Sequence, residues 1–403
     1  MAVMRGGATP ARAHAVSLDV RERWRMGAEA RLLVLVSAAL TAFGLAVLYS
    51  ASAFVAANEH DGASAYFLFR QLGGVGVGIV VFAIAAKLDA DRYRDWAWRL
   101  MGFTIVCMIA VLVLPERLAP TIHGSRRFLV GASFQPTELG KLAVVIWVSM
   151  LIEKKGDSIR RLTKGLVPFL VVVGLLAVLA ALEPDLSVAM LYALLMSLLL
   201  FVGGARMSHF IALGAMALPF ALTKIERWRY AVARLSAFFE PGTAPSQVSY
   251  QLNQSLIAVG SGGLFGRGFG MGFQQDNFVP FPYSDFVASN VGEEWGFIGI
   301  AGITIAFAIY ALCGFRIARK ARTPFLQLVA VGLTFTTVLT AFLHIGVVIG
   351  LLPTTGLTLP FISYGRSNLV LTMLFTGILV NIGSAKERVI GSGATDPLAA
   401  APA

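Results

Sequence analysis

Long apolar runs alternate with short polar segments along almost the whole chain. The first uncharged run, Leu32 to Ala57, exceeds the ~20 residues that a helix needs to span the hydrocarbon core of a bilayer, and several comparable runs follow it. Lipid offers no hydrogen-bonding partners to backbone groups, so runs of this length must be helical. The pattern therefore predicts an all-α integral membrane protein.

The apolar runs predict about ten transmembrane helices. We expect them at residues 32–54, 67–86, 100–115, 134–152, 165–182, 186–204, 207–223, 295–315, 325–349 and 367–384. An even number of crossings puts both chain ends on one side of the membrane. The chain then divides into an N-terminal tail over residues 1–28, a transmembrane domain over 29–388 and a C-terminal tail over 389–403.

The charges support this topology by where they lie. Charged residues make up only 14% of the chain, whereas a soluble protein has about a quarter, and the net charge of +11 alone would suggest a nucleic-acid partner. The basic groups, however, lie between or beyond the predicted spans, at residues 21–31, 92–99, 154–164, 316–322 and 386–388. This positive-inside pattern predicts that both termini are cytoplasmic, and no nucleic-acid surface is required. The tail over 1–28 lacks the apolar core of a signal peptide.

One outward connection, from Ile225 to Glu294, is far longer than an ordinary loop, which favours a functional role. Asp285 lies in it between prolines and the apolar entry of the next helix. A partly dehydrated carboxylate there has a raised pKa and suits a general base, although it would also suit the N-cap of that helix. The glycines of residues 260–270 permit a close backbone approach to a ligand, but no strand precedes them, so a phosphate-binding fingerprint does not fit.

Arginines of the long loop suggest an anionic ligand. The loop carries Arg227, Arg229, Arg234 and Arg267 against few acids. Arginine binds phosphate through paired hydrogen bonds, so a lipid diphosphate is a suitable ligand. Ordinary anionic lipid would also suit these side chains, and the sequence leaves both interpretations open.

Further polar side chains fall where the predicted helices should already be in the membrane. Glu138 and Lys141 lie three residues apart on one helix face, as a functional pair or as an ion pair that only joins two helices. Arg126 and Arg127 could bind phosphate or rest among lipid headgroups. Asp185, in the turn after Glu183-Pro184, could act in a site or cap the next helix.

Two more features complete the polar inventory. The segment 351–365 contains two prolines and two glycines within a charge-free stretch, so we expect a broken segment that lines the same outer cavity. Cys107 and Cys313 both fall inside apolar spans and suggest neither a disulfide nor a thiolate metal site.

These segments, in this order, resemble the SEDS family of bacterial cell-wall proteins, most closely its FtsW branch, with RodA as a near relative. The motifs on which the resemblance rests are Tyr49-Ser-Ala-Ser52, Arg70-Gln71, Gly124-Ser-Arg-Arg127 with Phe134-Gln-Pro-Thr-Glu-Leu139, Pro184-Asp-Leu186, Tyr250-Gln-Leu-Asn-Gln-Ser255, Gly292-Glu-Glu294 and Leu359-Pro-Phe-Ile-Ser-Tyr-Gly365. The resemblance covers about residues 32–388. His123, Phe128, His344 and Arg366 depart from the family pattern.

The resemblance implies a peptidoglycan glycosyltransferase of the bacterial cytoplasmic membrane that polymerises lipid II on the outer face during cell division. In that family the aspartate matching Asp285 is the acid-base candidate of an inverting transfer. The positions matching Glu138, Lys141 and Asp185 line the central cavity. The expected substrate-binding residues are these three with Arg126, Arg127, Gln251, Gln254, Ser255, Arg267 and Ser363.

The resemblance also implies partners. They are a class B penicillin-binding protein, other divisome proteins and membrane lipid. The carboxylates of the sequence make no recognisable metal cage, so a divalent cation such as Mg²⁺ enters only as an expectation about the diphosphate.

The sequence is also compatible with two other functions. A lipid II flippase or other transporter would also need about ten helices, but it should carry its charges near the bilayer midplane rather than at one end. A non-catalytic divisome scaffold would not need Asp285.

Overall fold

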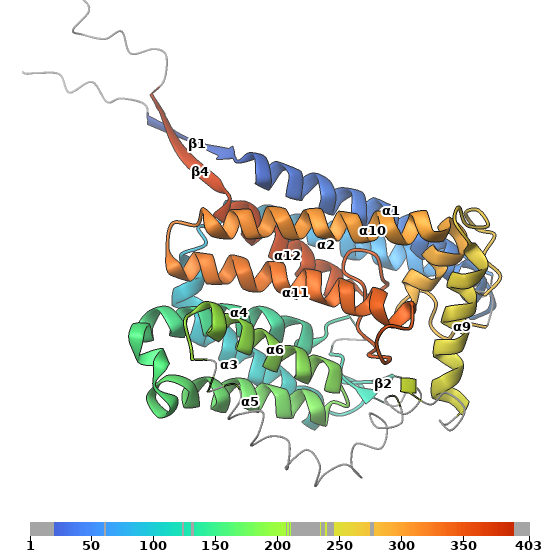
Figure 1. The fold of residues 1–403 in the computed structure, drawn as a ribbon, viewed down its shortest axis with the longest axis horizontal. Coiled ribbons are helices and arrows are strands. Elements are labelled where there is room, and N and C mark those ends of the chain that lie inside the picture. The colour runs from blue at the N-terminus through green and yellow to red at the C-terminus, as the bar shows by residue number, and fades with distance from the viewer. Residues whose placement is uncertain are drawn as a thin grey trace, which may run out of the picture.

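The computed structural model describes residues 20–59, 62–122, 125–129, 133–206, 208, 210, 234, 238–239, 246–274 and 278–390. Most of the helices run side by side along the long axis of the molecule (Figure 1). The helices are α1 (Ala28–Glu59), α2 (Tyr66–Lys87), α3 (Arg92–Val113), α4 (Pro136–Lys155), α5 (Val167–Leu182), α6 (Leu186–Val202), α9 (Ser246–Gly262), α10 (Val287–Arg319), α11 (Pro324–Val348) and α12 (Arg366–Ile382). Short helical turns at Gly156–Arg160 and Leu162–Leu166 join α4 to α5.

The predicted spans correspond to these helices, apart from 207–223, which lies outside the described residues except for 208 and 210. Within the described ranges, five helices are long and apolar enough to cross a membrane, namely α1, α2, α3, α10 and α11, and α5, α6 and α12 are shorter apolar helices. The chain is thus a helical, multi-pass membrane protein.

The two largest errors in the predicted boundaries are at helix starts. Helix α10 begins at Val287 rather than at 295, and α3 begins at Arg92 rather than at 100. Charged residues were used to end the predicted spans, but backbone hydrogen bonding continues through them where a helix extends past the hydrocarbon. The long loop consequently ends before Val287, and α9 forms a helix inside it.

A two-stranded ribbon joins the ends of the described chain, which the sequence did not predict. Strand β1 (Val20–Met26) pairs antiparallel with β4 (Ser384–Ile390), and the register sets Glu22 opposite Arg388 and Arg23 opposite Glu387. The ribbon leaves one end of the bundle, called here the ribbon end, whereas α9 lies across the opposite end, called here the α9 end (Figure 1).

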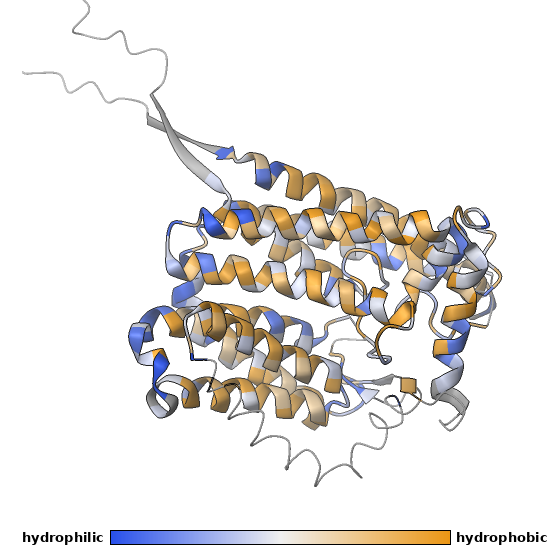
Figure 2. Cartoon of the chain, in the orientation of Figure 1, coloured by the Kyte–Doolittle hydropathy of each residue, from blue (hydrophilic) through white to orange (hydrophobic). Residues whose placement is uncertain are grey.

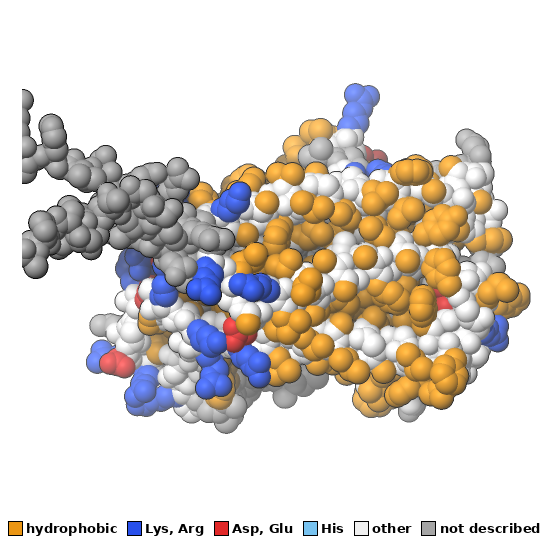
Figure 3. Space-filling view, turned by 90° about the horizontal axis from the view of Figure 1, so that it is seen from above, with side chains coloured by type: hydrophobic (Ala, Val, Ile, Leu, Met, Phe, Trp, Pro, Cys, Tyr) orange, Lys and Arg blue, Asp and Glu red, His pale blue; other side chains and the backbone are white. Residues whose placement is uncertain are grey.

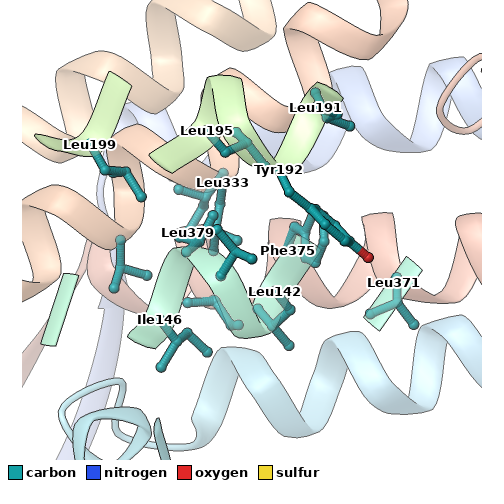
Figure 4. Close-up of a cluster of buried hydrophobic side chains, with 14 of the residues drawn as sticks. Leu142, Ile146, Leu191, Tyr192, Leu195, Leu199, Leu333, Leu371, Phe375 and Leu379 are labelled. Carbon is teal, nitrogen blue, oxygen red and sulfur yellow. The ribbon is translucent and has the colours of Figure 1, made fainter. Parts of the chain in front are cut away.

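Helix α4 is enclosed by other helices. It packs against α3, α6, α11 and α12, and almost all of its side chains are buried. Figure 4 shows Leu142 and Ile146 of α4 meeting side chains of α6, α11 and α12. This enclosure lets a membrane helix carry Glu138 and Lys141 without exposing them to lipid.

The surface divides into an apolar middle and charged ends. The helices are hydrophobic along their middle and hydrophilic near their termini (Figure 2). On the face seen in Figure 3, lysine and arginine side chains gather toward the ribbon end. Ion pairs join neighbouring segments there: Arg94 of α3 lies 3.1 Å from Glu153 of α4, and Arg322 lies 3.6 Å from Asp89.

A small hairpin and several connecting segments lie at the α9 end. Strands β2 (Thr121–Ile122) and β3 (Ser125–Arg126) pair antiparallel, between α3 and α4. Because neighbouring helices are antiparallel, the start of α4, the α5–α6 turn, the segment before α10 and the segment between α11 and α12 all come to this end. These are the segments in which the sequence places its candidate site residues.

Candidate functional site

The expected pair on α4 is formed and buried. Lys141 Nζ donates to Glu138 Oε1 at 2.7 Å, and both side chains are almost fully buried. The Asn368 side-chain amide, from α12, donates to the other Glu138 oxygen at 3.3 Å. The pair therefore joins α4 to α12, as expected for an ion pair between helices. It also lies near Asp185.

Asp185 serves as a cap and as a member of a charged cluster. The backbone N–H of Val188 donates to Asp185 Oδ1 at 3.3 Å, so the carboxylate caps α6 as expected. The other oxygen, Oδ2, accepts from Gln135 Nε2 at 3.3 Å and lies 3.9 Å from Arg127 Nη1. Burial raises the pKa of Asp185, and the positive charge of Arg127 opposes this rise.

Glu183 is the least satisfied acid of the site. Its side chain is 0% exposed, and neither carboxyl oxygen has a hydrogen-bond partner among the described residues. Burial, and then the nearby charge of Asp185, raise the pKa of Glu183 to about 8. This carboxyl is therefore largely protonated at neutral pH. The sequence drew attention to the turn but not to this difference between its two acids.

Asp285 is held before α10 without capping it. The N-cap is Phe286, and no side chain caps the helix, so the capping interpretation of Asp285 was wrong. Burial raises the pKa of Asp285, while the charges of Arg127 and Arg234 lower it. Asp285 and Asp185 thus share Arg127 as a neighbouring cation.

Arg234 reaches the same place from the long loop. Its Nη1 donates to the Thr354 carbonyl at 3.2 Å. A side chain at Gly356, where φ is +73°, would begin 3.7 Å from Asp285 Oδ2 and 3.9 Å from both terminal nitrogens of Arg234. Glycine therefore leaves a space that the acid and the guanidinium both border. The sequence named Arg234 only as one of several loop arginines.

The peptide before Asp285 is fixed by the segment between α11 and α12. Ser363 Oγ donates to the Ser284 carbonyl at 2.6 Å and accepts from Leu359 N at 2.8 Å. The backbone N–H of Tyr364 donates to the Tyr283 carbonyl at 2.8 Å. Ser363, predicted as a substrate-binding residue, is thus placed where it orients the backbone of Asp285.

Gln71 of α2 holds the segment between α11 and α12 through two hydrogen bonds. Its side-chain nitrogen donates to the Ser363 carbonyl at 3.2 Å, and its oxygen accepts from Gly365 N at 3.3 Å. The side chain is 2% exposed, and the ring of Phe67 on the same helix stacks on Tyr283 with centroids 4.6 Å apart. Gln71 belongs to the Arg70-Gln71 motif, but no sequence pattern predicts which residues it contacts.

Glu293 and Arg267 form a separate group. Glu293 is 0% exposed, lies 3.5 Å from Arg267 Nη1, and accepts from the backbone N–H groups of Phe273 and Gln274 at 2.9 and 3.0 Å. The glycines at 262, 266 and 296 lie against the backbone of the facing segment, with no space for a side chain. These three glycines therefore let the Gly-rich loop pack closely on α10.

The other predicted residues have these positions. Arg126 donates to the carbonyls of Leu114 and Ala119, and the Ser255 hydroxyl donates to the Val348 carbonyl at 3.0 Å. Gln251 and Gln254 are half-buried on α9. Thus Arg127, Glu138, Lys141, Asp185 and Asp285 gather at one end of the bundle, and Arg126, Ser255 and Arg267 bond to other parts of the protein. His123, Arg227 and Arg229 lie outside the described residues.

Two departures from the family pattern have partners in the structure. His344 Nδ1 lies 2.7 Å from the Leu357 carbonyl, and Arg366 donates to Ser133 Oγ at 2.7 Å. Both contacts hold the segments that surround the site.

The described side chains do not fit a protein-held divalent cation. Across the described residues, no three His, Cys, Asp or Glu side chains come together as a metal site. The acids of the cluster have Lys141, Arg127 and Arg234 as neighbouring cations.

Comparison with known proteins identifies a family. Residues 30–388 match the FtsW/RodA/SpoVE family, described as cell cycle proteins. A "Probable peptidoglycan glycosyltransferase FtsW" from Trichlorobacter lovleyi is 36% identical over 368 residues, which cover 91% of this chain and 96% of the relative. "Stage V sporulation protein E" of Bacillus subtilis is 35% identical over 354 residues, covering 87% of this chain and 96% of the relative.

Solved structures show the same fold. A chain of a peptidoglycan synthase complex, reported for the structural coordination of polymerization and crosslinking, aligns with a TM-score of 0.71 at 25% identity, covering 87% of this chain and 96% of the other. The rod shape determining protein RodA of Thermus thermophilus aligns with a TM-score of 0.63 at 25% identity, covering 87% and 95%. From its sequence and its fold, this chain belongs to the FtsW/RodA/SpoVE family.

Proposed function

We propose that this protein is a peptidoglycan glycosyltransferase that polymerises lipid II during cell division. The observation that carries the proposal is Asp285, a half-buried carboxylate held beside two arginines at the end of a membrane bundle. The relatives named as peptidoglycan glycosyltransferases support it, because they align over nearly their whole length.

Asp285 acts as the general base of an inverting transfer. It takes the proton of the acceptor sugar's 4-hydroxyl as that oxygen attacks the anomeric carbon of the donor, and undecaprenyl diphosphate leaves. Burial raises the pKa of Asp285 and so favours the protonated carboxyl after this transfer, while the charges of Arg127 and Arg234 oppose the rise and favour the ionised form. The two opposing effects suit a group that must both accept and release a proton.

The cationic side chains stabilise the charge that develops on the leaving diphosphate. Arg127 is about one-third exposed, so it remains accessible to a ligand while it faces Asp185. Fixed donors in a water-poor site stabilise a developing anion strongly. Lys141 is bonded to Glu138, so its contribution is to keep the pair neutral and in place. A divalent cation such as Mg²⁺ stays a prediction, and no step here depends on it.

The orientation and partners follow from the same proposal. The basic ribbon end faces the cytoplasm, both termini included, and the α9 end with Asp285 faces the outer side. The partner is a class B penicillin-binding protein, together with other divisome proteins. The solved peptidoglycan synthase complex supports a partner of this kind.

One assay separates this function from its alternatives. Purified protein with its penicillin-binding partner is given labelled lipid II, and the glycan products of the wild type, Asp285→Ala and the control Asp157→Asn are compared. We expect long chains from the wild type and the control, and none from Asp285→Ala. Asp157 is an exposed carboxylate at the ribbon end, which makes it a matched control.

The other outcomes point elsewhere. Undiminished chains from Asp285→Ala would contradict the proposed base. Transbilayer movement of lipid II without any polymer would indicate a transporter, and no activity of either kind, with normal partner binding, would indicate a scaffold. The position of the cluster favours the enzyme, because its acids lie at helix ends rather than near mid-membrane.

A further inference from the structure

The segment that follows α9 presents a row of large apolar side chains away from the protein. Leu264 is 55% exposed, Phe265 75%, Phe269 50%, Met271 70% and Phe273 57%. The only charged residue between 263 and 273 is Arg267, which pairs with Glu293. A continuous apolar surface of this kind marks an interaction site.

The backbone of this segment is locked onto α10, so its exposure is built into the fold. Helix α10 kinks at Gly296, where φ is +65°, and the kink frees carbonyl groups before it. The N–H groups of Arg267 and Gly268 donate to the carbonyls of Glu293 and Glu294, each at 3.0 Å. Glu293 in turn accepts from two N–H groups at the far end of the segment. The apolar side chains are therefore held outward by a rigid frame.

The frame lies at a definable depth in the membrane. Counting back the ~20 residues that span the hydrocarbon from the basic cluster that begins at Arg316 reaches Gly296. The N–H groups of Phe297 and Ile298 donate to the carbonyls of Gly263 and Leu264, at 2.9 and 3.2 Å. The segment consequently packs against α10 at the boundary between hydrocarbon and headgroups.

The same surface continues along the lipid-facing side of α10. Phe269 approaches Trp295 with ring centroids 6.5 Å apart, and Trp295 approaches Phe43 of α1 at 5.5 Å. Phe297 and Ile298, the next residues of α10, are 64% and 53% exposed. An apolar groove of about 330 Å³ between α1 and α10 begins at Trp295. Aromatic side chains at this depth are typical of membrane interfaces.

We propose that residues 263–273 form an interfacial anchor that inserts its apolar side chains into the leaflet at the α9 end. Bilayer lipid is the favoured occupant because the patch is continuous with the lipid-facing surface and because its one charge is neutralised within the protein. The anchor fixes the start of α10, and with it Asp285, at a set height above the hydrocarbon. It is independent of the catalytic proposal.

A depth measurement tests the anchor directly. The chain with Cys107→Ala and Cys313→Ala receives one environment-sensitive fluorophore, at Phe265→Cys, at the lipid control Phe297→Cys or at the water control Asp157→Cys. The protein is placed in nanodiscs with phospholipids brominated on their acyl chains. We expect quenching at 265 to be at least half of that at 297, and quenching at 157 to be near zero. Quenching at 265 no greater than at 157 would overturn the proposal.

A second experiment keeps the native cysteines. A photo-crosslinking phenylalanine analogue replaces Phe265, and the full complex is irradiated in native membranes. We expect phospholipid adducts of the protein as the main product. A main product joined to another polypeptide would overturn lipid as the occupant and identify the patch as a protein interface.

Discussion

Two groups of buried acids lie at the α9 end and differ in how fully they are paired. In the anchor group, Glu293 has backbone N–H donors and Arg267. In the second group, called here the site group, Asp285 and Asp185 share Arg127, and Glu183 has no hydrogen-bond partner among the described residues. A buried polar group is costly unless it is satisfied. The saturated acid therefore stabilises the fold, whereas Glu183, whose carboxyl oxygens lack partners among the described residues, has capacity left for a substrate or a proton.

Two bulky residues near the site group have strained backbone conformations. Phe281 and Phe361 adopt positive φ values of +53° and +66°, four residues before Asp285 and two before Ser363. Such conformations are strained for bulky residues and persist where the surrounding structure imposes them. The strain lies in the two segments that meet beside Asp285.

The largest expected effect is on catalysis at Asp285. Asp285→Asn should lower the polymerisation rate about 10²–10⁴-fold, because it removes the group that accepts the proton. The thermal midpoint of unfolding should stay the same or rise, since a buried carboxylate is replaced by a neutral amide. Radiolabelled lipid II assays and thermal unfolding on the same preparation check both. Loss of stability in parallel with activity would place Asp285 with Glu293 as a structural acid.

The next largest effect is a loss of folding stability on substitution of Glu293, in contrast to the acids of the site group. Glu293→Leu should lower the free energy of unfolding by about 2–5 kcal/mol, because two part-buried N–H groups and the Arg267 guanidinium lose their acceptor. Glu183→Leu is the matched variant, an equally buried glutamate without hydrogen-bond partners among the described residues, and it should leave stability unchanged or higher. Equal losses in the two variants would show that pairing in the structure does not separate the two groups.

A substitution at Gln71 tests whether the position of Asp285 depends on hydrogen bonds made outside the site. Gln71→Leu should lower kcat about 10–100-fold by displacing the peptide before Asp285, since small misplacements of a reacting group cost this much. The KM for lipid II should change little, because Gln71 is buried below the site. Gln327→Leu, at an exposed glutamine near the ribbon end of α11, is the control. A rise in KM with unchanged kcat would mean that Gln71 acts in binding instead.

The smallest effect is a shift in pH dependence. Arg127 lowers the pKa of Asp285, so Arg127→Gln should raise that pKa and move the acid limb of the pH–rate profile to higher pH. The base is active above its pKa, and the variant should thus lose activity first on the acid side. Rate measurements across the acid limb for wild type and variant give the shift. If the acid limb does not move, Arg127 does not influence the pKa of the catalytic base.

Local pattern predicted the membrane fold well. Helix α11, expected at 325–349, runs from Pro324 to Val348, and α12, expected at 367–384, runs from Arg366 to Ile382. Hydrophobicity works here because lipid contact is a property of each residue and its near neighbours. The early start of α10 escaped this method because its first residues, up to Glu294, are buried by protein rather than by lipid.

Pairing of side chains could not be predicted in the same way. The sequence picked out Asp185 and Asp285 but treated Glu183 as part of a turn and Arg267 as a ligand residue. Gln71 contacts Ser363 across 292 positions, and no local pattern encodes such a contact. The motifs marked which residues matter without showing which partner each one meets.

By itself, then, the sequence determined that this protein crosses a membrane many times, and at which end of the bundle its polar residues gather. It also singled out Asp285. The tertiary structure alone decided which acids are saturated and which are not, that Gln71 and Arg234 serve the same site, and that the Gly-rich loop locks onto α10. The reason is physical: transfer into lipid depends on the composition of one segment, whereas the state of a buried charge depends on partners brought from distant segments by packing.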